Sequence, residues 1–300
     1  MSPLRLAALT TLSLFAFAGN SLLCRAALKA TNAPQLTIDA ASFTTIRLIA
    51  GAIVLWLLVR ARQHASTPAS THVPKANGNW LSAFALFSYA ICFSYAYVRL
   101  PAATGALLLF GAVQATMIGV GLCKGERLRL PQLGGLAIAL GGLIGLLVPD
   151  PATLVAPPFY SAALMLTAGL AWGVYSLRGK GAGDATTITA GNFARAMPLA
   201  IAFSVLQINV MYLEPAGVVY ALLSGAITSG VGYAIWYSAL PALKATTAAT
   251  VQLSVPVIAT FGGVVFLNEA LTWRIVLASA AILGGIALVV FMKPPDHVNK

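Results

Sequence analysis

Charged residues are scarce in this 300-residue sequence. Only 8% of the residues are Asp, Glu, Lys or Arg, whereas 59% are hydrophobic, and the mean hydropathy is +0.87. Soluble proteins carry about 25% charged residues, which keep their surfaces in water. The scarcity of charge therefore argues against an ordinary soluble domain and favours the lipid bilayer as the solvent of most of the chain.

Acidic residues are the rarest charges, with 7 Asp and Glu against 18 Lys and Arg, which leaves a net charge of +11. A basic chain can bind nucleic acid, but here the basic residues are scattered between apolar segments rather than gathered on one face. We expect no nucleic-acid partner. Lys and Arg also collect in the cytoplasmic loops of membrane proteins, which is the simpler reason for the excess.

Cysteine and histidine are too few and too dispersed for a metal centre. Cys24, Cys92 and Cys123 fall in three different apolar segments, without a CxxC pair or a neighbouring pair of histidines. We expect three buried, reduced thiols. The HExxH and GxSxG motifs and paired acids inside an apolar segment are also missing. The sequence therefore predicts no metal, no cofactor and no enzymatic activity.

What the chain has in abundance is long apolar runs. Most of them are free of charge, their lengths suit membrane-spanning helices, and they lack the alternation of barrel strands. They predict an all-α membrane protein with ten transmembrane helices, at approximately Leu6–Cys24, Leu36–Val59, Trp80–Val98, Ala102–Cys123, Pro131–Val148, Phe159–Leu177, Thr186–Gln207, Gly217–Leu240, Ala245–Leu267 and Trp273–Met292.

The chain also contains an internal repeat. The stretch GERLRLPQLGGLAIALGGLIGL from Gly125 matches NEALTWRIVLASAAILGGIALV from Asn268, so that Glu126 aligns with Glu269 and a Gly-Gly pair with a Gly-Gly pair. With five helices in each half, the halves 1–150 and 151–300 point in opposite directions across the bilayer. Inverted repeats are a known construction of secondary transporters, which hold the substrate between the halves.

The first apolar segment resembles a signal peptide, but we expect it to be retained because the repeat needs it. FAGNSLL (Phe17–Leu23) corresponds to AWGVYSL (Ala171–Leu177) at the start of the second half.

The basic loop residues predict the orientation. With both termini in the cytoplasm, the inner side holds Arg5, Arg60, Arg62, Lys75, Lys124, Arg127, Arg129, Arg178, Lys180, Lys244, Lys293 and Lys300, and the outer side only Arg25, Lys29, Arg99 and Arg274.

Taken together, these features resemble a known family. The ten helices, the GNS and WGVYS patterns and the Glu that precedes a Gly-Gly helix are similar to the drug/metabolite transporter superfamily, EamA type. FAGNSLLCRAAL (Phe17–Leu28), PAATGALLLFGAVQATMIGVGL (Pro101–Leu122) and YAIWYSALPALKATTAATVQLSVPV (Tyr233–Val257) most resemble its aromatic-amino-acid exporter subgroup (YddG-like). The resemblance implies a multi-pass protein of the inner (plasma) membrane that exports amino acids, aromatic or apolar, and related metabolites through a central cavity.

Two arginines are expected near the middle of apolar helices, where a charge is costly and is therefore a functional candidate. Arg47 lies in FTTIR (Phe43–Arg47), which aligns with GNFAR (Gly191–Arg195). Arg stays charged and can clamp a carboxylate through two parallel hydrogen bonds. One or both of these arginines contact an amino-acid carboxylate or line the path; alternatively, both are structural and bind helix ends or carbonyls.

The other candidates for substrate binding are uncharged. Amides can serve both ends of a zwitterion, and aromatic rings suit an apolar side chain or an ammonium group. Hydrogen bonding between helices is the alternative role for each of them. Trp172 is the strongest of the set because it lies too deep for an interfacial tryptophan. The candidates are Asn20, Tyr89, Gln114, Trp172, Tyr175, Asn192, Tyr233 and Gln252.

Two prolines are candidate hinges, because a proline inside a helix frees a backbone carbonyl and permits a kink. Pro198 falls in the seventh segment and Pro256 in the ninth. The glycines of the repeat predict close helix packing within the monomer, although a dimer seam is also compatible with them. They are Gly141, Gly142, Gly145, Gly284 and Gly285.

Several alternatives stay open. A carrier of a phosphorylated metabolite or nucleotide sugar would have the same architecture but needs Lys and Arg converging on the cavity. A channel lacks a visible selectivity loop or ring of charge. No Asp, Glu or His is expected at mid-membrane depth, so the sequence favours proton coupling no more than facilitated transport.

The count of ten crossings predicts that both tails are on one side of the membrane. Membrane-impermeant labelling of tags on the two ends of the chain in intact and permeabilised cells is the test. We expect both tags to react only after permeabilisation. Reaction of one tag in intact cells and of the other only after permeabilisation would rule out the predicted number of helices.

Overall fold

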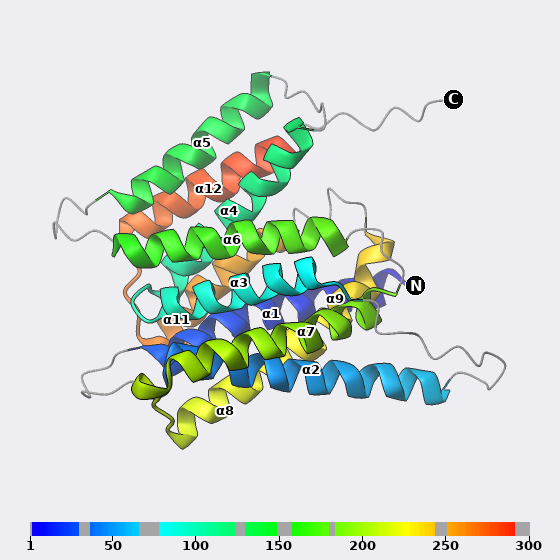
Figure 1. The fold of residues 1–300 in the computed structure, drawn as a ribbon. Helices are drawn as coiled ribbons and strands as arrows, with labels where there is room; N and C mark the ends of the chain where they lie inside the picture. Colours follow the sequence, from blue (N-terminus) through cyan, green and yellow to red (C-terminus); the bar gives the residue numbers. More distant parts are fainter. Residues whose placement is uncertain are drawn as a thin grey trace.

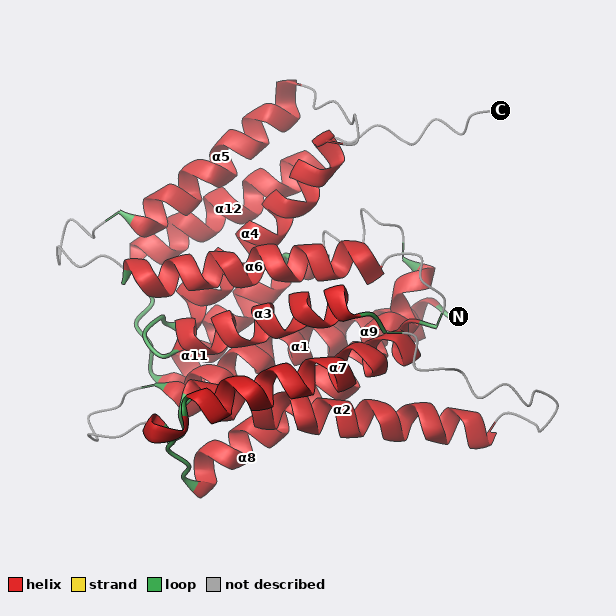
Figure 2. Ribbon diagram, in the orientation of Figure 1, coloured by secondary structure: helices red, strands yellow, loops and turns green. Residues whose placement is uncertain are grey.

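The computed structural model describes residues 2–29, 37–65, 78–123, 130–148, 158–179, 184–243 and 251–291. Within these ranges all regular elements are helices, and the single β-bridge, between Ile38 and Leu213, is isolated (Figure 2). Eight of the helical segments described are long and apolar enough to cross a membrane, and two further apolar helices are shorter. The predicted all-α fold is confirmed.

The helices follow the predicted apolar segments (Figure 1). Their bounds are α1 Pro3–Leu28, α2 Ala40–Ala65, α3 Trp80–Tyr97, α4 Ala102–Cys123, α5 Leu130–Leu147, α6 Phe159–Gly179, α7 Ala185–Leu206, α8 Pro215–Leu223, η2 Ser224–Val231, α9 Gly232–Ala239, α11 Ser254–Leu267 and α12 Trp273–Phe291, with short 3₁₀ turns η1 Ile208–Val210 and η3 Leu240–Ala242.

Polar side chains fix several helix starts. Asn79 accepts a hydrogen bond from the Ser82 backbone N–H at the start of α3, and Asp184 accepts one from Thr186 at the start of α7. Such caps satisfy backbone donors that the first helical turn leaves unpaired. At the other end of a helix, Asn268 adopts the left-handed conformation that terminates α11, with φ 52°.

Two predicted helices differ in detail from the sequence analysis. The eighth is a composite, because the π-helix η2 separates α8 from α9. The ninth contains a break at Leu253, and α11 starts only at Ser254, so that Pro256 lies in the first turn of a helix rather than in its interior. Proline is tolerated there because the first-turn N–H groups have no partner within the helix. Residues 244–250, Glu126 and eight of the loop lysines and arginines lie outside the described residues.

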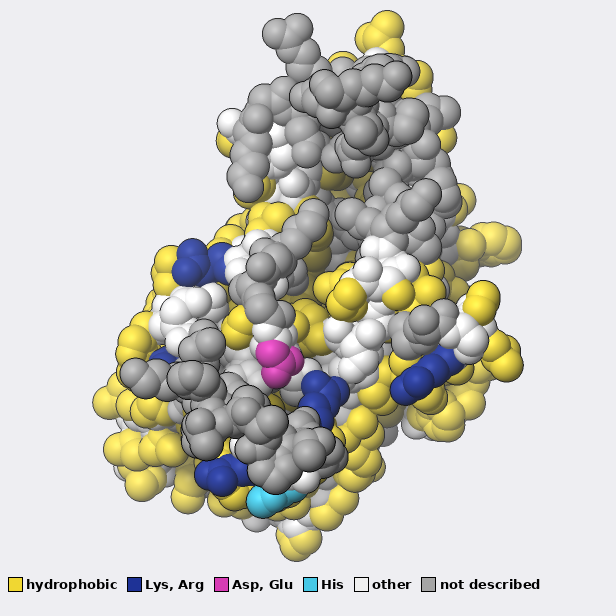
Figure 3. Space-filling view, turned by 90° about the vertical axis from the view of Figure 1, so that its right-hand side faces the viewer, with side chains coloured by type: hydrophobic (Ala, Val, Ile, Leu, Met, Phe, Trp, Pro, Cys, Tyr) yellow, Lys and Arg dark blue, Asp and Glu magenta, His cyan; other side chains and the backbone are white. Residues whose placement is uncertain are grey.

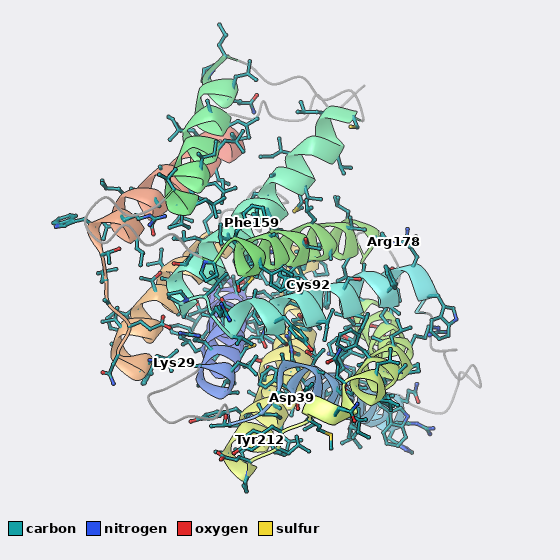
Figure 4. All side chains as sticks on the ribbon, turned by 60° about the vertical axis from the view of Figure 1, so that its left-hand side comes forward. Lys29, Asp39, Cys92, Phe159, Arg178 and Tyr212 are labelled. Carbon is teal, nitrogen blue, oxygen red and sulfur yellow. The ribbon has the colours of Figure 1, made fainter. Side chains whose placement is uncertain are left out.

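The bundle has two ends, which we call near and far. The near end is where α1 starts and α12 stops, and the far end is where α1 stops (Figure 1). Lys and Arg side chains lie around the near-end face (Figure 3), and Arg178 lies on the opposite side of the molecule from Lys29, Asp39 and Tyr212 (Figure 4).

The outer surface of the bundle is strongly apolar. Large hydrophobic side chains are exposed on nearly every helix, including Phe159 at 87%, Trp273 at 80% and Phe266 at 73%. A monomeric soluble protein rarely leaves so much apolar surface in water. Of the three cysteines, Cys24 is buried and Cys92 half-buried, but Cys123 is exposed at the end of α4, so the prediction of three buried thiols is wrong for that residue.

Helix pairing relates segments that are far apart in the sequence. α2 packs on α7, α3 on α6, α4 on both α6 and α11, and α5 on α12. α1 packs on α11 and along the composite helix α8–η2–α9, which also contacts α2. The first five helices and the last five are therefore interleaved rather than forming separate bodies.

Glycines allow a close approach between α5 and α12. A Cβ on Gly285 would lie 2.4 Å from the Gly135 carbonyl oxygen, and a Cβ on Gly142 would lie 2.8 Å from the Ala281 Cβ. Gly141, Gly145 and Gly284 have open space instead, so the prediction of close packing within the monomer is wrong for these three. The predicted role of these glycines in packing within the monomer is confirmed for Gly142 and Gly285.

The α5–α12 contact predicts unequal effects of two adjacent substitutions. Gly285→Ala should destabilise the protein by about 1–3 kcal/mol, because its Cβ meets backbone atoms that cannot move aside cheaply. Gly284→Ala is the matched control and should have no such cost. Thermal unfolding of both variants in detergent, followed by size-exclusion chromatography, measures the difference. Equal melting temperatures would contradict the close packing.

Candidate functional site

The structure encloses a cavity of about 540 Å³ inside the helical bundle. Residues of α1, α3, α4, α6 and α9 line it, together with Gln252. Gly179 and Ala185, at the near-end termini of α6 and α7, also belong to the lining, as do Pro241 and Leu243. The cavity thus extends from the middle of the bundle toward the near end.

The far end is closed by a polar cluster that joins four helices. Arg25 donates from Nε to Glu269 Oε1 at 3.0 Å and from Nη1 to the carbonyls of Tyr97 and Val98 at 2.9 and 3.1 Å. Glu269 Oε2 accepts from the Ala102 backbone N–H at 2.7 Å. Glu269 thus forms a salt bridge with Arg25 and caps the first turn of α4.

A second contact strengthens this far-end cluster. Lys29 Nζ donates to the Leu267 carbonyl at 2.7 Å, which joins the ends of α1 and α11. The side chains of Arg25 and Glu269 are only 11% and 10% exposed, so solvent screens their attraction less than at an open surface.

Aromatic rings form the deep wall of the cavity. Trp172 lies at its centre, with ring centroids 4.8 Å from Tyr89 and 5.2 Å from Tyr233. Phe17 makes edge contacts with Tyr233 and with Trp236. Tilted and edge-on arrangements are the favoured geometries of aromatic pairs. The aromatic lining residues are Phe17, Tyr89, Phe93, Phe110, Trp172, Tyr233, Trp236 and Tyr237.

A buried hydrogen-bond network stands beside the aromatic wall. Asn20 Nδ2 donates to Tyr89 Oη at 3.2 Å, and Asn20 Oδ1 accepts from the hydroxyls of Ser224 and Thr228 at 2.7 and 3.3 Å. Asn20 and Tyr89 are 5% and 4% exposed, and both line the cavity. The network therefore fixes the orientation of two polar groups at the cavity surface.

Arg47 extends this network behind the wall. Its Nε donates to Ser229 Oγ at 3.1 Å and its Nη2 to Tyr89 Oη at 3.2 Å, and its Cζ lies 5.3 and 5.2 Å from the ring centroids of Tyr89 and Phe93. The residue is 2% exposed, and its Nη1 has no hydrogen-bond partner. The only salt bridge among the described residues is Arg25–Glu269, so no described carboxylate neutralises Arg47.

The π-helix η2 supplies the hydroxyls that meet Asn20 and Arg47. In a π-helix the hydrogen bonds run from residue i to i+5, and such segments often mark functional sites. Ser224 and Ser229, five residues apart, serve Asn20 and Arg47 respectively. Gly225 permits the approach, because a Cβ there would lie 2.3 Å from the Arg47 carbonyl oxygen.

Six of the predicted substrate-binding residues line the cavity and four do not. The lining six are Asn20, Tyr89, Gln114, Trp172, Tyr233 and Gln252. Of the other four, Arg47 lies behind the wall as described. Tyr175 stacks on Trp172 from outside the cavity and accepts a hydrogen bond from Asn192 Nδ2 at 3.5 Å.

Asn192 and Arg195 have contacts that hold helices rather than face the cavity. Asn192 Oδ1 accepts from the Asn79 backbone N–H at 3.0 Å, at the start of α3. Arg195 is half-buried, and its Nη1 donates to the Gly191 carbonyl within α7. Pro198 lies inside α7 but is exposed on the bundle surface.

The lining also contains residues that sequence reasoning missed. Phe17, Trp236 and Tyr237 belong to the aromatic wall, and Ser224, Thr228 and Ser229 complete the polar network. Phe17 could have been predicted from the sequence, since it begins the FAGNSLL motif. The hydroxyl residues carried no comparable signal in the sequence. Among the described residues, no three of His, Cys, Asp and Glu are grouped as a metal site.

Comparisons with known proteins agree with this architecture. Residues 160–291 match the EamA-like transporter family. The chain is 53% identical over 281 residues to an uncharacterized protein of Pseudomonas aeruginosa, PA1977, with 94% of this chain and 93% of that protein covered. A crystal structure with 18% identity superposes with a TM-score of 0.65 over 97% of this chain and 98% of the other, which shows a common fold. The chain is therefore a multi-pass membrane protein that belongs to the EamA-like transporter family.

Proposed function

We propose that this transporter exports amino acids, aromatic or apolar, and related metabolites from the cytoplasm by alternating access through the central cavity. The observation that carries the proposal is the cavity wall, in which aromatic rings surround Trp172 and the amide and hydroxyl of Asn20 and Tyr89 reach the surface. A volume of about 540 Å³ lies within the usual range for small-molecule sites.

The charge of the lining favours this substrate class over the alternative carrier. A phosphorylated metabolite or nucleotide sugar needs several Lys or Arg side chains around its phosphates. The described residues that line the cavity include no Lys or Arg, and Arg47 acts only from behind the wall. Among the same residues there is also no Asp, Glu or His, so we favour facilitated movement down the substrate gradient.

The pairing of helices supports two inverted halves, 1–150 and 151–300. Each half is taken as five spans, with α8–η2–α9 as the eighth, α11 as the ninth and α12 as the tenth. Exchanging span 1 with 6, 2 with 7, 3 with 8, 4 with 9 and 5 with 10 maps the main helix pairs onto one another. The pair α3–α6 becomes α1 with the eighth span, and α4–α6 becomes α1–α11.

Departures from this symmetry support an inward-open state. α1 packs on α3 and α4, whereas among the described residues α6 makes no comparable contact with α9 or α11. The cavity occupies the space between α6 and α9. If the near end is cytoplasmic, as the basic loops predict, the structure is loaded from the cytoplasm and closed at the far end.

Release on the other side then requires the far-end cluster to open. The bonds of Arg25 to Glu269 and to the end of α3 must break, together with the Lys29 contact to α11. The cavity lies within one chain, and we propose that the monomer is the transporting unit.

Trp172 provides a direct test of the cavity. Trp172→Ala should raise the half-saturating concentration of L-phenylalanine counterflow in liposomes by about tenfold, because an aromatic contact surface of the substrate is lost. The matched control is Trp56→Ala, since Trp56 is 53% exposed on α2 and faces away from the cavity. Unchanged counterflow by Trp172→Ala would remove this residue from the binding site.

Cross-linking tests the opening of the far end. With the native cysteines replaced, the pair Arg25→Cys and Glu269→Cys should react with a short bis-methanethiosulfonate reagent, which joins the two thiols through disulfides. The cross-linked protein should lose counterflow until a reductant cleaves those disulfides. Each single-cysteine variant controls for the modification itself. Full counterflow by the cross-linked protein would show that the substrate leaves without separation of α1 from Glu269.

A further inference from the structure

We infer that the cavity prefers aromatic carboxylates that lack an ammonium group over the corresponding amino-acid zwitterions, and that Arg47 sets this preference from behind the cavity wall. The inference rests on the proposed function, because it concerns the same cavity, and it ranks anionic metabolites related to the amino acids above the zwitterions themselves.

The first observation is the uncompensated charge of Arg47. The groups that receive its hydrogen bonds, Ser229 Oγ and Tyr89 Oη, are neutral hydroxyls, and Nη1 is unpaired. Hydroxyls solvate a guanidinium but do not cancel its charge. A buried cation without a counter-ion is strongly unfavourable, so an anion that enters its surroundings gains the interaction that the protein does not supply.

The second observation is the short path from this charge to the cavity. Tyr89 and Phe93 both line the cavity, and the Arg47 Cζ lies 5.3 and 5.2 Å from their ring centroids. An apolar wall screens a charge far less than water does. A carboxylate on the cavity side of Tyr89 therefore lies within the attractive field of Arg47.

The third observation is the hydrogen-bonding capacity that the wall has left. Tyr89 Oη already accepts from Asn20 Nδ2 and Arg47 Nη2, so both of its acceptor positions are used and only its O–H remains. Asn20 Oδ1 accepts from Ser224 at 2.7 Å and shares the single Thr228 hydroxyl hydrogen, at 3.3 Å, with the Ser224 carbonyl, and the second N–H of the Asn20 amide remains. The two polar groups at this part of the cavity surface offer donors, and a carboxylate is an acceptor of both.

An ammonium group has no equivalent partner here. It needs acceptors or acidic groups, and the described lining residues include no Asp or Glu. The remaining options are neutral: the aromatic faces, the side-chain oxygens of Gln114 and Gln252, and the hydroxyls of Ser21, Ser176, Tyr233 and Tyr237. The field of Arg47 opposes a cation at any of them. A zwitterion can bind, but the attraction of its carboxylate to Arg47 is offset by the repulsion of its ammonium group.

Direct binding to the purified full-length protein in detergent tests the preference without leakage of the probes through lipid. Isothermal titration calorimetry would compare three molecules that share a phenyl ring: 3-phenylpropanoate, L-phenylalanine and 2-phenylethylamine. We expect 3-phenylpropanoate to bind about tenfold more tightly than L-phenylalanine, with 2-phenylethylamine the weakest. Equal or reversed affinities, or no binding of 3-phenylpropanoate, would overturn the inference.

Variants identify the origin of the preference. Arg47→Gln should remove the advantage of 3-phenylpropanoate over L-phenylalanine, and Arg47→Lys should retain part of it. Tyr89→Phe, which keeps the ring and deletes the donor, should also reduce it and serves as the test if Arg47→Gln fails to fold. Arg60→Gln is the control, since Arg60 is exposed on the same helix. A preference that survives both Arg47→Gln and Tyr89→Phe would refute their role.

Counterflow of labelled L-phenylalanine in liposomes separates this inference from the proposed function. Binding preference for the anion without any counterflow would overturn amino-acid export and leave the anion site standing. Counterflow with equal binding of zwitterion and anion would overturn the anion preference alone.

Discussion

The hydrogen bonds of one buried guanidinium organise the interior of this transporter. Arg47 is almost completely removed from solvent, and placing a charged residue in the middle of a membrane helix costs about 2.5–3.5 kcal/mol even by insertion scales. The surrounding helices reduce that cost with hydroxyls rather than with an acid. Ser229 comes from η2 and Tyr89 from α3, so one side chain of α2 holds parts of both halves of the chain together. Because Tyr89 is also bonded to Asn20, the position of α1 depends on the same network.

The two ends of the bundle are stabilised in different ways. At the far end, charged side chains and backbone carbonyls connect α1, α3, α4 and α11 through bonds that are strong but few. At the near end, residues at the termini of α6, α7 and α9 line the cavity. The glycine contact between α5 and α12 lies outside this region and packs too closely to rearrange. A transport cycle of the proposed kind would thus exchange polar contacts at the ends of α1 and α6 while the α5–α12 pair moves little.

Much of this architecture could be predicted because a membrane leaves a chain few choices. An apolar run of about 20 residues must satisfy its own backbone hydrogen bonds, and a helix does so. The rotation of each helix was harder to predict. Arg47 and Arg195 are aligned in the repeat, yet Arg47 donates to Tyr89, which lines the cavity, whereas Arg195 donates to the Gly191 carbonyl within α7. A helix that is apolar all round has no polar stripe from which its orientation can be deduced.

The polar network was the least visible part of the site. Ser and Thr in a helix can bond to the carbonyl four residues earlier, as Thr228 does to Ser224, and such residues carry no sequence signal of an additional partner. The aromatic wall was only partly predicted for a related reason. Trp172 and Tyr175 share a helical face, but the narrow cavity touches the first and leaves the second behind it.

The π-helix affects whether related proteins keep the same cavity lining. A single residue advances an α-helix by about 100°, so the wider winding of Ser224–Val231 sets the rotational phase of everything that follows it in the eighth span. Tyr233, Trp236 and Tyr237 owe their inward direction to that phase. In a relative that has lost one residue from this stretch, the same three aromatic rings would turn toward lipid without any of them being substituted.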